Sequence, residues 1–284
     1  MPIEIRTPTA EHVAELGRIA YDAFHDIATS HGFASDFASV DYARAVVGLL
    51  IQQETVHAAA AFDGDRPRGS NFMNMWGDVA GIGPVSVDLD AQGQGIGTLL
   101  MQDALQHAGQ QGFDQIRLCQ ESFNMQSLAL YSALGFDVKE PLAYVSLPTP
   151  DAAPDGFRAA NGDDHDEMDA LCREVYRISR KGEYAALAAA GFPAFVLDRG
   201  DRIRGYIIGT AIGHAVAETD DDMLALHTGI AASMPDSHAY VPMRQGDLYR
   251  RSLAVGARNL KVLNLMAYGP YEEPSGTYCP SVMF

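Results

Sequence analysis

Glycine recurs at every second position in the segment Gly93-Gln94-Gly95-Ile96-Gly97, between a strand-like run that ends at Val87 and a helix-like run. Because glycine has no Cβ, these positions allow positive φ angles and a close approach of the backbone to a ligand. The N–H groups of the first helical turn have no partner within the helix, and the positive end of the helix dipole lies behind them. A strand, a glycine-rich turn and a helix in this order are typical of a phosphate-binding site.

Two other kinds of phosphate-binding loop fit this segment badly. A dinucleotide-binding turn needs a third glycine, where the chain has Thr98 or Leu100, and an acidic residue about 20 positions later, near Arg117. A triphosphate loop needs Gly-Lys followed by Ser or Thr, which the segment lacks. The spacing that does occur is Gln92-x-x-Gly95-x-Gly97.

A second segment, from Asn124 to Phe136, places polar groups on one face of an expected helix. Asn124, Ser127 and Tyr131 are separated by three and by four positions, so they share a helix face. Gly135 follows at the position of a helix C-cap. A tyrosine on such a face is suited to proton donation.

Together the two segments resemble the signatures of the GNAT acetyltransferase superfamily. The first signature, Q/R-x-x-G-x-G/A, is matched by Gln92, Gly95 and Gly97. The second, N-x-x-A-x-x-L-Y-x-x-x-G-F, is matched from Asn124 onward, with Ser127 in place of alanine. The resemblance implies an α+β fold with two GNAT-like domains, each a mixed, mostly antiparallel twisted sheet flanked by helices. It also implies a transferase that moves acetyl from acetyl-CoA, as co-substrate, to a primary amine of a small molecule or peptide by direct attack.

The resemblance assigns roles to individual residues. Tyr131 is the acid that protonates the leaving thiolate, and backbone N–H groups in a loosened strand around Ser86 and Val87 hold the carbonyl oxygen. The residues that bind the coenzyme A moiety are Val85, Val87, Gln92, Gly93, Gln94, Gly95, Ile96, Gly97, Thr98, Asn124 and Ser127. No metal is expected, since His227 and His238 have no ligand partners at useful spacing.

The acceptor amine must lose a proton before it attacks, and several side chains are candidates for the base. We favour Glu121, because it ends the strand before Asn124. Asp88 and Glu54 stay open as alternatives, whereas His57 is expected to be a core histidine.

The net charge of −17 sets expectations about partners. It argues against nucleic acid and anionic membranes, and it leans toward a cationic acceptor. It also opposes an anionic co-substrate: Asp88 and Asp90 precede the turn, and Arg117 is the cation that we expect to assist. Three cysteines without a CxxC pair, an N-terminus unlike a signal peptide and the lack of a long apolar run favour the cytoplasm.

The segment 148–156 holds three prolines and a glycine, which predicts a boundary between two domains. We expect an acetyl-CoA-binding domain over 1–148 and a degenerate GNAT-like domain over 156–284. The openings of the two halves resemble each other, with Ile5-Arg6 and Glu11-His12 matched by Phe157-Arg158 and Asp164-His165. This pattern predicts that a short strand runs into an acidic helix start in each half.

Hydrophobic periodicity places the elements that position these residues. In the first half it predicts helices over 9–24, 40–52, 96–111 and 124–134, and strands over 3–6, 54–62, 68–76, 79–87, 114–120 and 137–147. In the second half it predicts strands over 193–199, 202–212, 222–231 and 260–267, a helix over 240–256 and an extended arm over 271–284. The counterpart of the glycine turn would then be 231–238, which contains no glycine.

Two functions of other classes stay open: a sensor that binds acetyl-CoA without turnover, and a structural pair of inactive domains. The acceptor also stays open among polyamines, aminoglycosides, amino acids and protein N-termini. A homodimer is compatible with the sequence.

Overall fold

Similar capping contacts begin the first helical segment of both halves of the chain. The structure, a computed structural model, describes residues 2–200 and 202–283. The N–H of Thr9 donates to Nδ1 of His12 at 3.0 Å, and the N–H of Asn161 donates to Oδ2 of Asp164 at 2.7 Å. Each cap follows a three-residue strand and precedes two helices, so the predicted likeness of the two openings is confirmed.

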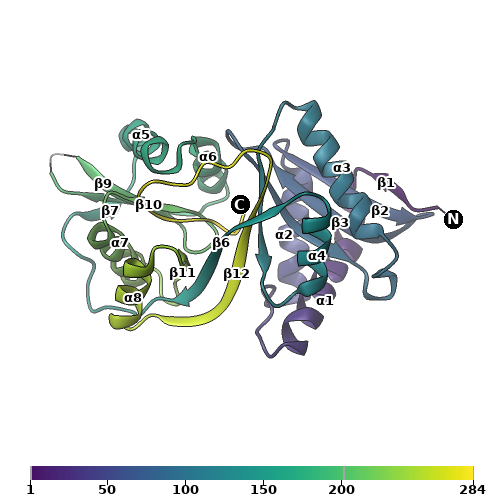
Figure 1. The fold of residues 1–284 in the computed structure, drawn as a ribbon, viewed down its shortest axis with the longest axis horizontal. Coiled ribbons are helices and arrows are strands. Elements are labelled where there is room, and N and C mark those ends of the chain that lie inside the picture. The colour runs from purple at the N-terminus through teal and green to yellow at the C-terminus, as the bar shows by residue number, and fades with distance from the viewer. Residues whose placement is uncertain (1, 201, 284) are drawn as a thin grey trace.

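The first half has the predicted order of elements, with boundaries that shift by a few residues. Its first helix is longer than predicted and continues to residue 30. The helices are α1 (Val13–Ser30), α2 (Val40–Gln52), α3 (Ile96–Gln110) and α4 (Met125–Ala133), and the strands are β1 (Glu4–Arg6), β2 (Val56–Asp63), β3 (Arg66–Asn74), β4 (Ala80–Val87), β5 (Ile116–Glu121) and β6 (Asp137–Ser146). Apolar clusters attach α1 and α2 to one face of the sheet and α3 and α4 to the other (Figure 1).

The second half repeats this order. Its helices are α5 (His165–Tyr176), α6 (Lys181–Ala189), α7 (Asp220–Ser233) and α8 (Gly246–Ala254), and its strands are β7 (Phe157–Ala159), β8 (Ala194–Asp198), β9 (Ile203–Ile208), β10 (Ala215–Ala217), β11 (His238–Pro242), β12 (Arg258–Tyr268) and β13 (Thr277–Cys279). Figure 1 shows the two halves side by side, with β6 and β12 running between them. Segment 148–156 contains neither helix nor strand, and the domain boundary there remains a prediction.

Two predictions for the second half are wrong. Residues 222–231 lie within helix α7 rather than in a strand, because Thr219 caps the helix by accepting a hydrogen bond from the N–H of Asp222 at 3.2 Å. Met223, Leu226 and Ile230 then face the core at helical spacing. Residues 240–256 are not one helix, because β11 ends at Pro242 and α8 begins only at Gly246.

The two halves exchange strands within one sheet. The eight-stranded sheet has the order β1-β2-β3-β4-β5-β12-β6-β11, so β12 of the second half lies between β5 and β6 of the first. Along β12, Leu263 lies opposite both Glu121 and Leu142, and Lys261 lies opposite Tyr144. The remaining strands form a second sheet in the order β13-β10-β9-β8-β7. The first half therefore does not complete its sheet alone, and β11 and β12 of the second half pair within that sheet.

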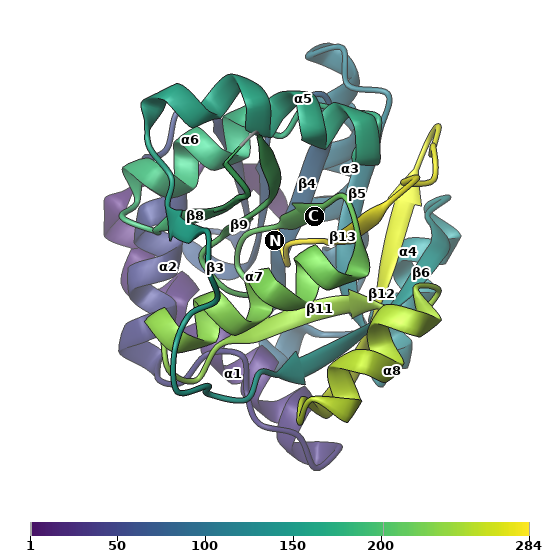
Figure 2. The same cartoon turned by 90° about the vertical axis from the view of Figure 1, so that its left-hand side faces the viewer.

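Strands β4 and β5 separate soon after they meet. These parallel strands pair at Ala80 with Ile116 and at Gly81 with Arg117, and the ladder does not continue to the ends of the strands at Val87 and Glu121. In the second half, the corresponding place beside β10 is taken by β13, which pairs with β10 and also lies against β11 (Figure 2). A gap between the strands therefore exists in the first half and is filled in the second.

The predicted C-terminal arm packs on the molecule as an extended segment. It contributes β13, and the carbonyl of Met283 accepts a hydrogen bond from Nδ2 of Asn74 at 2.8 Å. Its last residue, Phe284, lies outside the described residues. Within residues 2–200 and 202–283, no helix combines the length and apolar character that crossing a bilayer requires.

The strand exchange predicts that the two halves unfold together. Leu263 is 2% exposed, so we expect Leu263→Ala to lower the free energy of unfolding by about 2–5 kcal/mol. Denaturation followed by the fluorescence of Trp76, the single tryptophan, and by far-UV circular dichroism should give one coincident transition. Leu260→Ala, 44% exposed on the same strand, is the control and should change stability by less than about 0.5 kcal/mol. Two separated transitions, with Trp76 insensitive to Leu263→Ala, would contradict the coupling.

Candidate active site

The three glycines of the turn before α3 serve different purposes. Gly93 and Gly95 have φ angles of 74° and 84°, and a Cβ at either position would meet no atom within 4 Å. They are needed for their left-handed conformation rather than for space. Gly97 lies inside α3, where a Cβ would stand 3.1 Å from Cδ2 of Leu130 on α4. It therefore lets α3 and α4 approach each other.

The start of α3 offers backbone N–H groups without a side-chain cap. Gly95 is the N-cap residue, so the first-turn N–H groups of Ile96, Gly97 and Thr98 receive no side-chain cap. Residues 92–95 are exposed, whereas the Ile96 side chain is buried in the core. This conformation suits an anionic phosphate group, which backbone N–H groups can bind.

The two glutamines of the turn stabilise its shape. Nε2 of Gln92 donates to the carbonyl of Val87 at 3.2 Å, and Nε2 of Gln94 donates to the carbonyl of Asp90 at 3.0 Å. Both amide groups are thus engaged within the loop. The side chain of Ile96 does not reach the surface, so any contact with a ligand at this position is limited to its N–H group.

The acidic residues before the turn are paired with arginines, which sequence reasoning missed. Arg68 donates to Asp88 at 2.9 Å and to Asp90 at 2.8 Å. Arg66 on the same strand is 3.2 Å from Asp88, and Arg18 on α1 is 3.6 Å from it. The Arg68 guanidinium lowers the pKa of Asp90 below its usual range. These pairs offset the repulsion that the two carboxylates would exert on a phosphate group.

The expectation that Arg117 assists the turn is wrong. Its side chain is 1% exposed and its guanidinium lies 4.8 Å from the centre of the Tyr271 ring, in the C-terminal segment. Burial lowers its pKa to about 10. Alternation along β5 points it to the face opposite that of Leu118, which packs in the same apolar cluster as α3 residues.

The free edge of β4 carries backbone donors at Val85 and Val87. The N–H of Asp88 donates to the carbonyl of Arg68 at 2.9 Å, so alternate residues of β4 direct their N–H groups toward β3. Those of Val85 and Val87 then point the other way, into the gap beside β5. The expected loosening around Ser86 and Val87 lies elsewhere: these residues keep their register with β3, and the irregularity occurs at the cis Gly83–Pro84 peptide.

Asn124 and Ser127 form the N-terminal cap of α4. Oδ1 of Asn124 accepts from the N–H of Ser127 at 3.0 Å, and the Ser127 hydroxyl donates to the Asn124 carbonyl at 3.0 Å. Gln120 joins this cap, since its Nε2 donates to the Asn124 carbonyl at 2.8 Å and its Oε1 accepts from Nδ2 of Asn264 on β12 at 2.9 Å. Coenzyme A binding by Asn124 and Ser127 remains a prediction.

Tyr131 lies at the predicted face of α4, beside the gap between β4 and β5. It packs in one apolar cluster with Ile82 of β4 and Leu118 of β5. Burial raises the pKa of its phenol to about 12, so the group keeps its proton across the physiological pH range. A protonated phenol is what a donor to a developing thiolate requires.

Glu121 is held at the end of β5 by charged partners. Nζ of Lys261 on β12 lies 2.5 Å from Oε1 of Glu121 and 2.5 Å from Oδ1 of Asp36, in the loop between α1 and α2. Burial raises the pKa of Glu121 to about 7; the Asp36 carboxylate adds to this rise and Lys261 opposes it. A carboxyl group with this pKa suits a general base near neutral pH.

The other candidate bases are placed less favourably. Asp88 is buried among arginines, and Glu54 is exposed in the turn before β2. His57 bonds through Nε2 to Asp103 on α3 at 2.7 Å and stacks on His107. It is thus on the α3 side of the sheet, with its polar contact already made.

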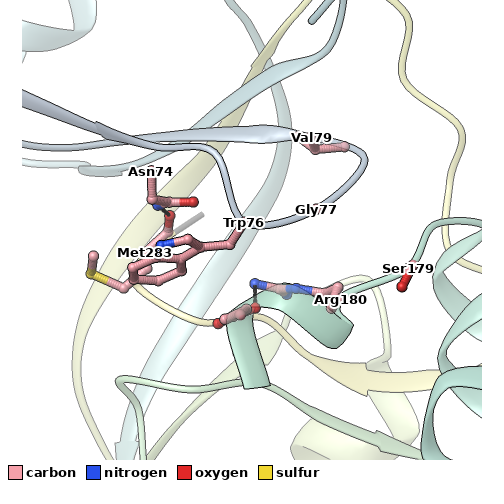
Figure 3. A pocket seen from close by; sticks show the side chains of 8 residues that line it. Asn74, Trp76, Gly77, Val79, Ser179, Arg180 and Met283 are labelled. Carbon is pink, nitrogen blue, oxygen red and sulfur yellow. Dashed lines mark hydrogen bonds and ion pairs between the residues drawn. The ribbon is translucent and has the colours of Figure 1, made fainter. Parts of the chain in front are cut away.

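Hollows elsewhere in the molecule do not include the predicted ligand-binding residues. One hollow of about 10 Å³, room for a single water, lies at the junction of the halves between Trp76, Arg180 and Met283 (Figure 3). Another, of about 240 Å³, lies between segment 147–150 and helices α7 and α8. Among the described residues, no group of three or more His, Cys, Asp or Glu side chains is placed to hold a metal ion.

The second half replaces the glycine turn with an acidic cap. Since α7 begins at Asp220, the counterpart of the turn is the short link Glu218-Thr219, not 231–238. The link contains no glycine, and the Thr219 side chain caps the helix. The first turn that follows carries Asp220, Asp221 and Asp222, which repel a phosphate group. The second half thus lacks the anion-binding features of the first.

Part of the chain matches a known protein family. The model of the Acetyltransferase (GNAT) family matches residues 13–136, which include the glycine turn and Tyr131. Among curated proteins, the mycothiol acetyltransferase of Saccharomonospora viridis is 43% identical over 56 residues, or 20% of this chain and 18% of that protein. The match thus spans less than a fifth of that relative.

Solved structures resemble the chain over nearly its whole length. A candidate acetyltransferase from Pyrococcus horikoshii has a TM-score of 0.82 at 17% identity, covering 99% of this chain and 95% of that one. A tandem GNAT protein from the clavulanic acid biosynthesis pathway has a TM-score of 0.60 at 13% identity, covering 95% of this chain and 100% of that one. At such identities the likeness concerns the fold. Residues 13–136 therefore match the model of the Acetyltransferase (GNAT) family, and the whole chain has a two-domain GNAT-like fold.

Proposed function

We propose that this protein is an N-acetyltransferase that moves the acetyl group of acetyl-CoA to a primary amine by direct attack. One observation carries the proposal: the gap between β4 and β5 has an anion-binding helix start at one end, and Tyr131 and Glu121 flank it. On this proposal the gap would be lined by a phosphate site, strand-edge N–H groups, a proton donor and a proton acceptor.

The turn from Gln92 to Thr98 would hold the pyrophosphate of coenzyme A. The N–H groups of Ile96, Gly97 and Thr98 at the start of α3 are the donors, and the helix dipole supports them. Gly93 and Gly95 supply the conformation that exposes these donors. In the gap, the N–H groups of Val85 and Val87 face the position where the thioester carbonyl would lie.

In the proposed reaction, the amine nitrogen forms a bond to the carbonyl carbon and the carbon–sulfur bond breaks. Val85 and Val87 would stabilise the oxyanion that develops on the carbonyl oxygen. An acceptor that arrives as R–NH₃⁺ loses two protons. Glu121 would take the first before attack, and the second, lost from nitrogen as the carbon–sulfur bond breaks, would replace the phenolic proton that Tyr131 donates to the leaving thiolate. The products are an N-acetyl amine and coenzyme A.

The acceptor is best described by its charge. The net charge of −17 favours an amine that arrives as a cation, of a small molecule or a peptide, and disfavours nucleic acid and anionic membranes. We propose work in the cytoplasm, because all three cysteines are unpaired thiols. We further propose one acetyl-CoA per chain, because the first half alone has the glycine turn.

The turn can be tested by a change of conformation alone. We expect Gly95→Ala to weaken acetyl-CoA binding about 5- to 30-fold in calorimetry, because a left-handed conformation costs a residue with a Cβ roughly 1–2 kcal/mol. Gly109→Ala is the matched control: it lies on the same helix with free space around it and without a positive φ. Wild-type protein should bind one equivalent; an absence of binding, or equal affinity in Gly95→Ala, would contradict the site.

Tyr131 separates an enzyme from a sensor. We expect Tyr131→Phe to lower kcat by about 10²- to 10⁴-fold while acetyl-CoA binding is unchanged, because only the proton donor is lost. Tyr268→Phe is the control, since Tyr268 is 37% exposed and its ring packs beside that of Phe136. Release of coenzyme A in the presence of an amine panel is the measurement. Equal turnover in Tyr131→Phe would exclude the assigned role.

Glu121 predicts the pH dependence of the reaction. A base must be ionised, so kcat/KM should fall about tenfold per pH unit as the pH drops below the raised pKa of Glu121, near 7. We expect Glu121→Gln to lower the rate by about 100-fold or more and to remove this acidic limb from the pH profile. A limb that persists in Glu121→Gln would identify another base.

A further inference from the structure

We propose that Lys261, which the second half contributes on β12, is a positioning residue of the transfer site: it keeps Glu121 ionised, so that Glu121 can accept a proton from an acceptor amine. The inference rests on the proposed function, because it concerns the base of that reaction. It gives the second half a part in the chemistry of the first.

Three segments distant in the sequence meet at Lys261. Its ammonium lies 2.5 Å from a carboxylate oxygen of Asp36 and 2.5 Å from one of Glu121, and its residue is 7% exposed. The Tyr144 ring on β6 lies 5.4 Å away and forms an aromatic wall. Burial alone lowers the pKa of Lys261, but Asp36 and Glu121 outweigh it and raise that pKa. The lysine is therefore a fixed positive charge.

Glu121 keeps one oxygen for another donor. Lys261 contacts Oε1, whereas Oε2 is buried and has no hydrogen-bond partner among the residues that the structure describes. A buried carboxylate oxygen without a donor is costly. The N–H of an acceptor amine would satisfy it, and the lysine contact fixes the carboxylate in place for that purpose.

The remaining titratable groups that face Glu121 are neutral near pH 7. They are Tyr144 on β6, Tyr240 on β11 and Cys119 on β5. Burial raises the pKa of each: above the usual range for Tyr144, well above it for Tyr240, and to about 12 for Cys119. The charge of the pocket is therefore set by Asp36, Glu121 and Lys261. Above the pKa of Glu121, two carboxylates and one ammonium leave one net negative charge.

This charge matches an acceptor that enters as a single ammonium ion. Binding of R–NH₃⁺ brings the pocket to neutrality, and transfer of one proton to Glu121 leaves the amine, the protonated Glu121, the Asp36 carboxylate and the Lys261 ammonium, again neutral. Without Lys261, burial and Asp36 together would protonate Glu121 before the acceptor arrives. The acceptor class is therefore a primary alkyl amine without a carboxylate beside its nitrogen.

The test reads Glu121 directly in the free, full-length protein. The carboxyl carbon of Glu121, assigned by its loss in Glu121→Gln, is titrated by carbon-13 NMR. We expect Lys261→Met to raise its pKa by about one to three pH units and Asp36→Asn to lower it, because a cation and an anion are removed respectively. Lys261→Arg should keep it near 7. Lys139→Met, a lysine of β6 paired with Asp137, is the control and should not move it.

The acidic limb of the kcat/KM profile should follow the pKa of Glu121. It should shift to higher pH in Lys261→Met and to lower pH in Asp36→Asn. Opposite shifts would not follow from general loosening, and Asp36→Asn and Lys261→Arg test the proposal even where Lys261→Met does not fold. If Lys261→Met and Asp36→Asn both fold, and neither the pKa of Glu121 nor the acidic limb shifts, the inference is overturned while the proposed function stands. A carboxyl that shifts as expected, in a wild-type protein that acetylates no amine, would overturn the proposed function and, with it, the role of Lys261 in transfer.

Discussion

The placement of β12 between β5 and β6 is the constraint on which the rest of the structure depends. A strand in the interior of a sheet must pair along both edges, because unpaired backbone N–H and C=O groups are costly when buried. β12 supplies the hydrogen-bonding partner of β5 along one edge, and this pairing joins the two halves. It also sets Lys261 near Glu121 and Asn264 near Gln120. Residues of the second half thus help to position both Glu121 and the cap at the start of α4.

The position beside β4 in the first half corresponds to the position beside β10 in the second, and the two are built differently. In the first half, β4 departs from β5 after Gly81, and a glycine turn exposes the start of α3. In the second half, β13 lies beside β10, Thr219 caps α7, and the first helical turn carries three aspartates. Each feature would oppose an anionic ligand by itself. The second half would therefore oppose an anionic ligand through several features rather than one substitution, and the C-terminal segment that fills its gap also ties the halves together.

Predictions from the sequence are accurate for most features that have a local physical cause, and the helix over Asp220–Ser233 is the exception. The glycine turn was recognised because positive φ angles at Gly93 and Gly95 are properties of those residues themselves. The strand wrongly predicted over 222–231 had a local cause as well: the signal was the cap at Thr219 with its acidic turn, and dense apolar residues concealed it. The predicted boundary at 148–156 lies in the connection between β6 and β7. The sequence does not indicate that β12, a strand of the second half, joins the sheet of the first half.

The electrostatics of the site could not be predicted because its partners are distant in the chain. Lys261 is 140 residues from Glu121 and 225 from Asp36, and Asp88 meets Arg68 across 20 residues. Periodicity places each residue on a face, yet it does not give the register between strands that decides which charges meet. For that reason the sequence predicts only repulsion between Asp88 or Asp90 and a phosphate group, whereas Arg66 and Arg68 compensate these carboxylates. Arg117 was misjudged for the same reason, since its partner Tyr271 lies in the C-terminal segment.

Tyr131 and Glu121, the proposed proton donor and proton acceptor, lie on opposite faces of the sheet, and this bears on how acetyl transfer would proceed. Alternation along β5 directs Cys119 and Glu121 to one face and Leu118, which packs in the cluster of Tyr131, to the other. The two groups that we propose for proton transfer therefore approach the gap from different sides and would not exchange a proton with each other. The nearest thiol, Cys119, donates to the carbonyl of Ser281 at 3.4 Å, and burial raises its pKa to about 12, so it is a poor nucleophile. Attack by the amine itself, with Glu121 behind it, is the route that these groups support.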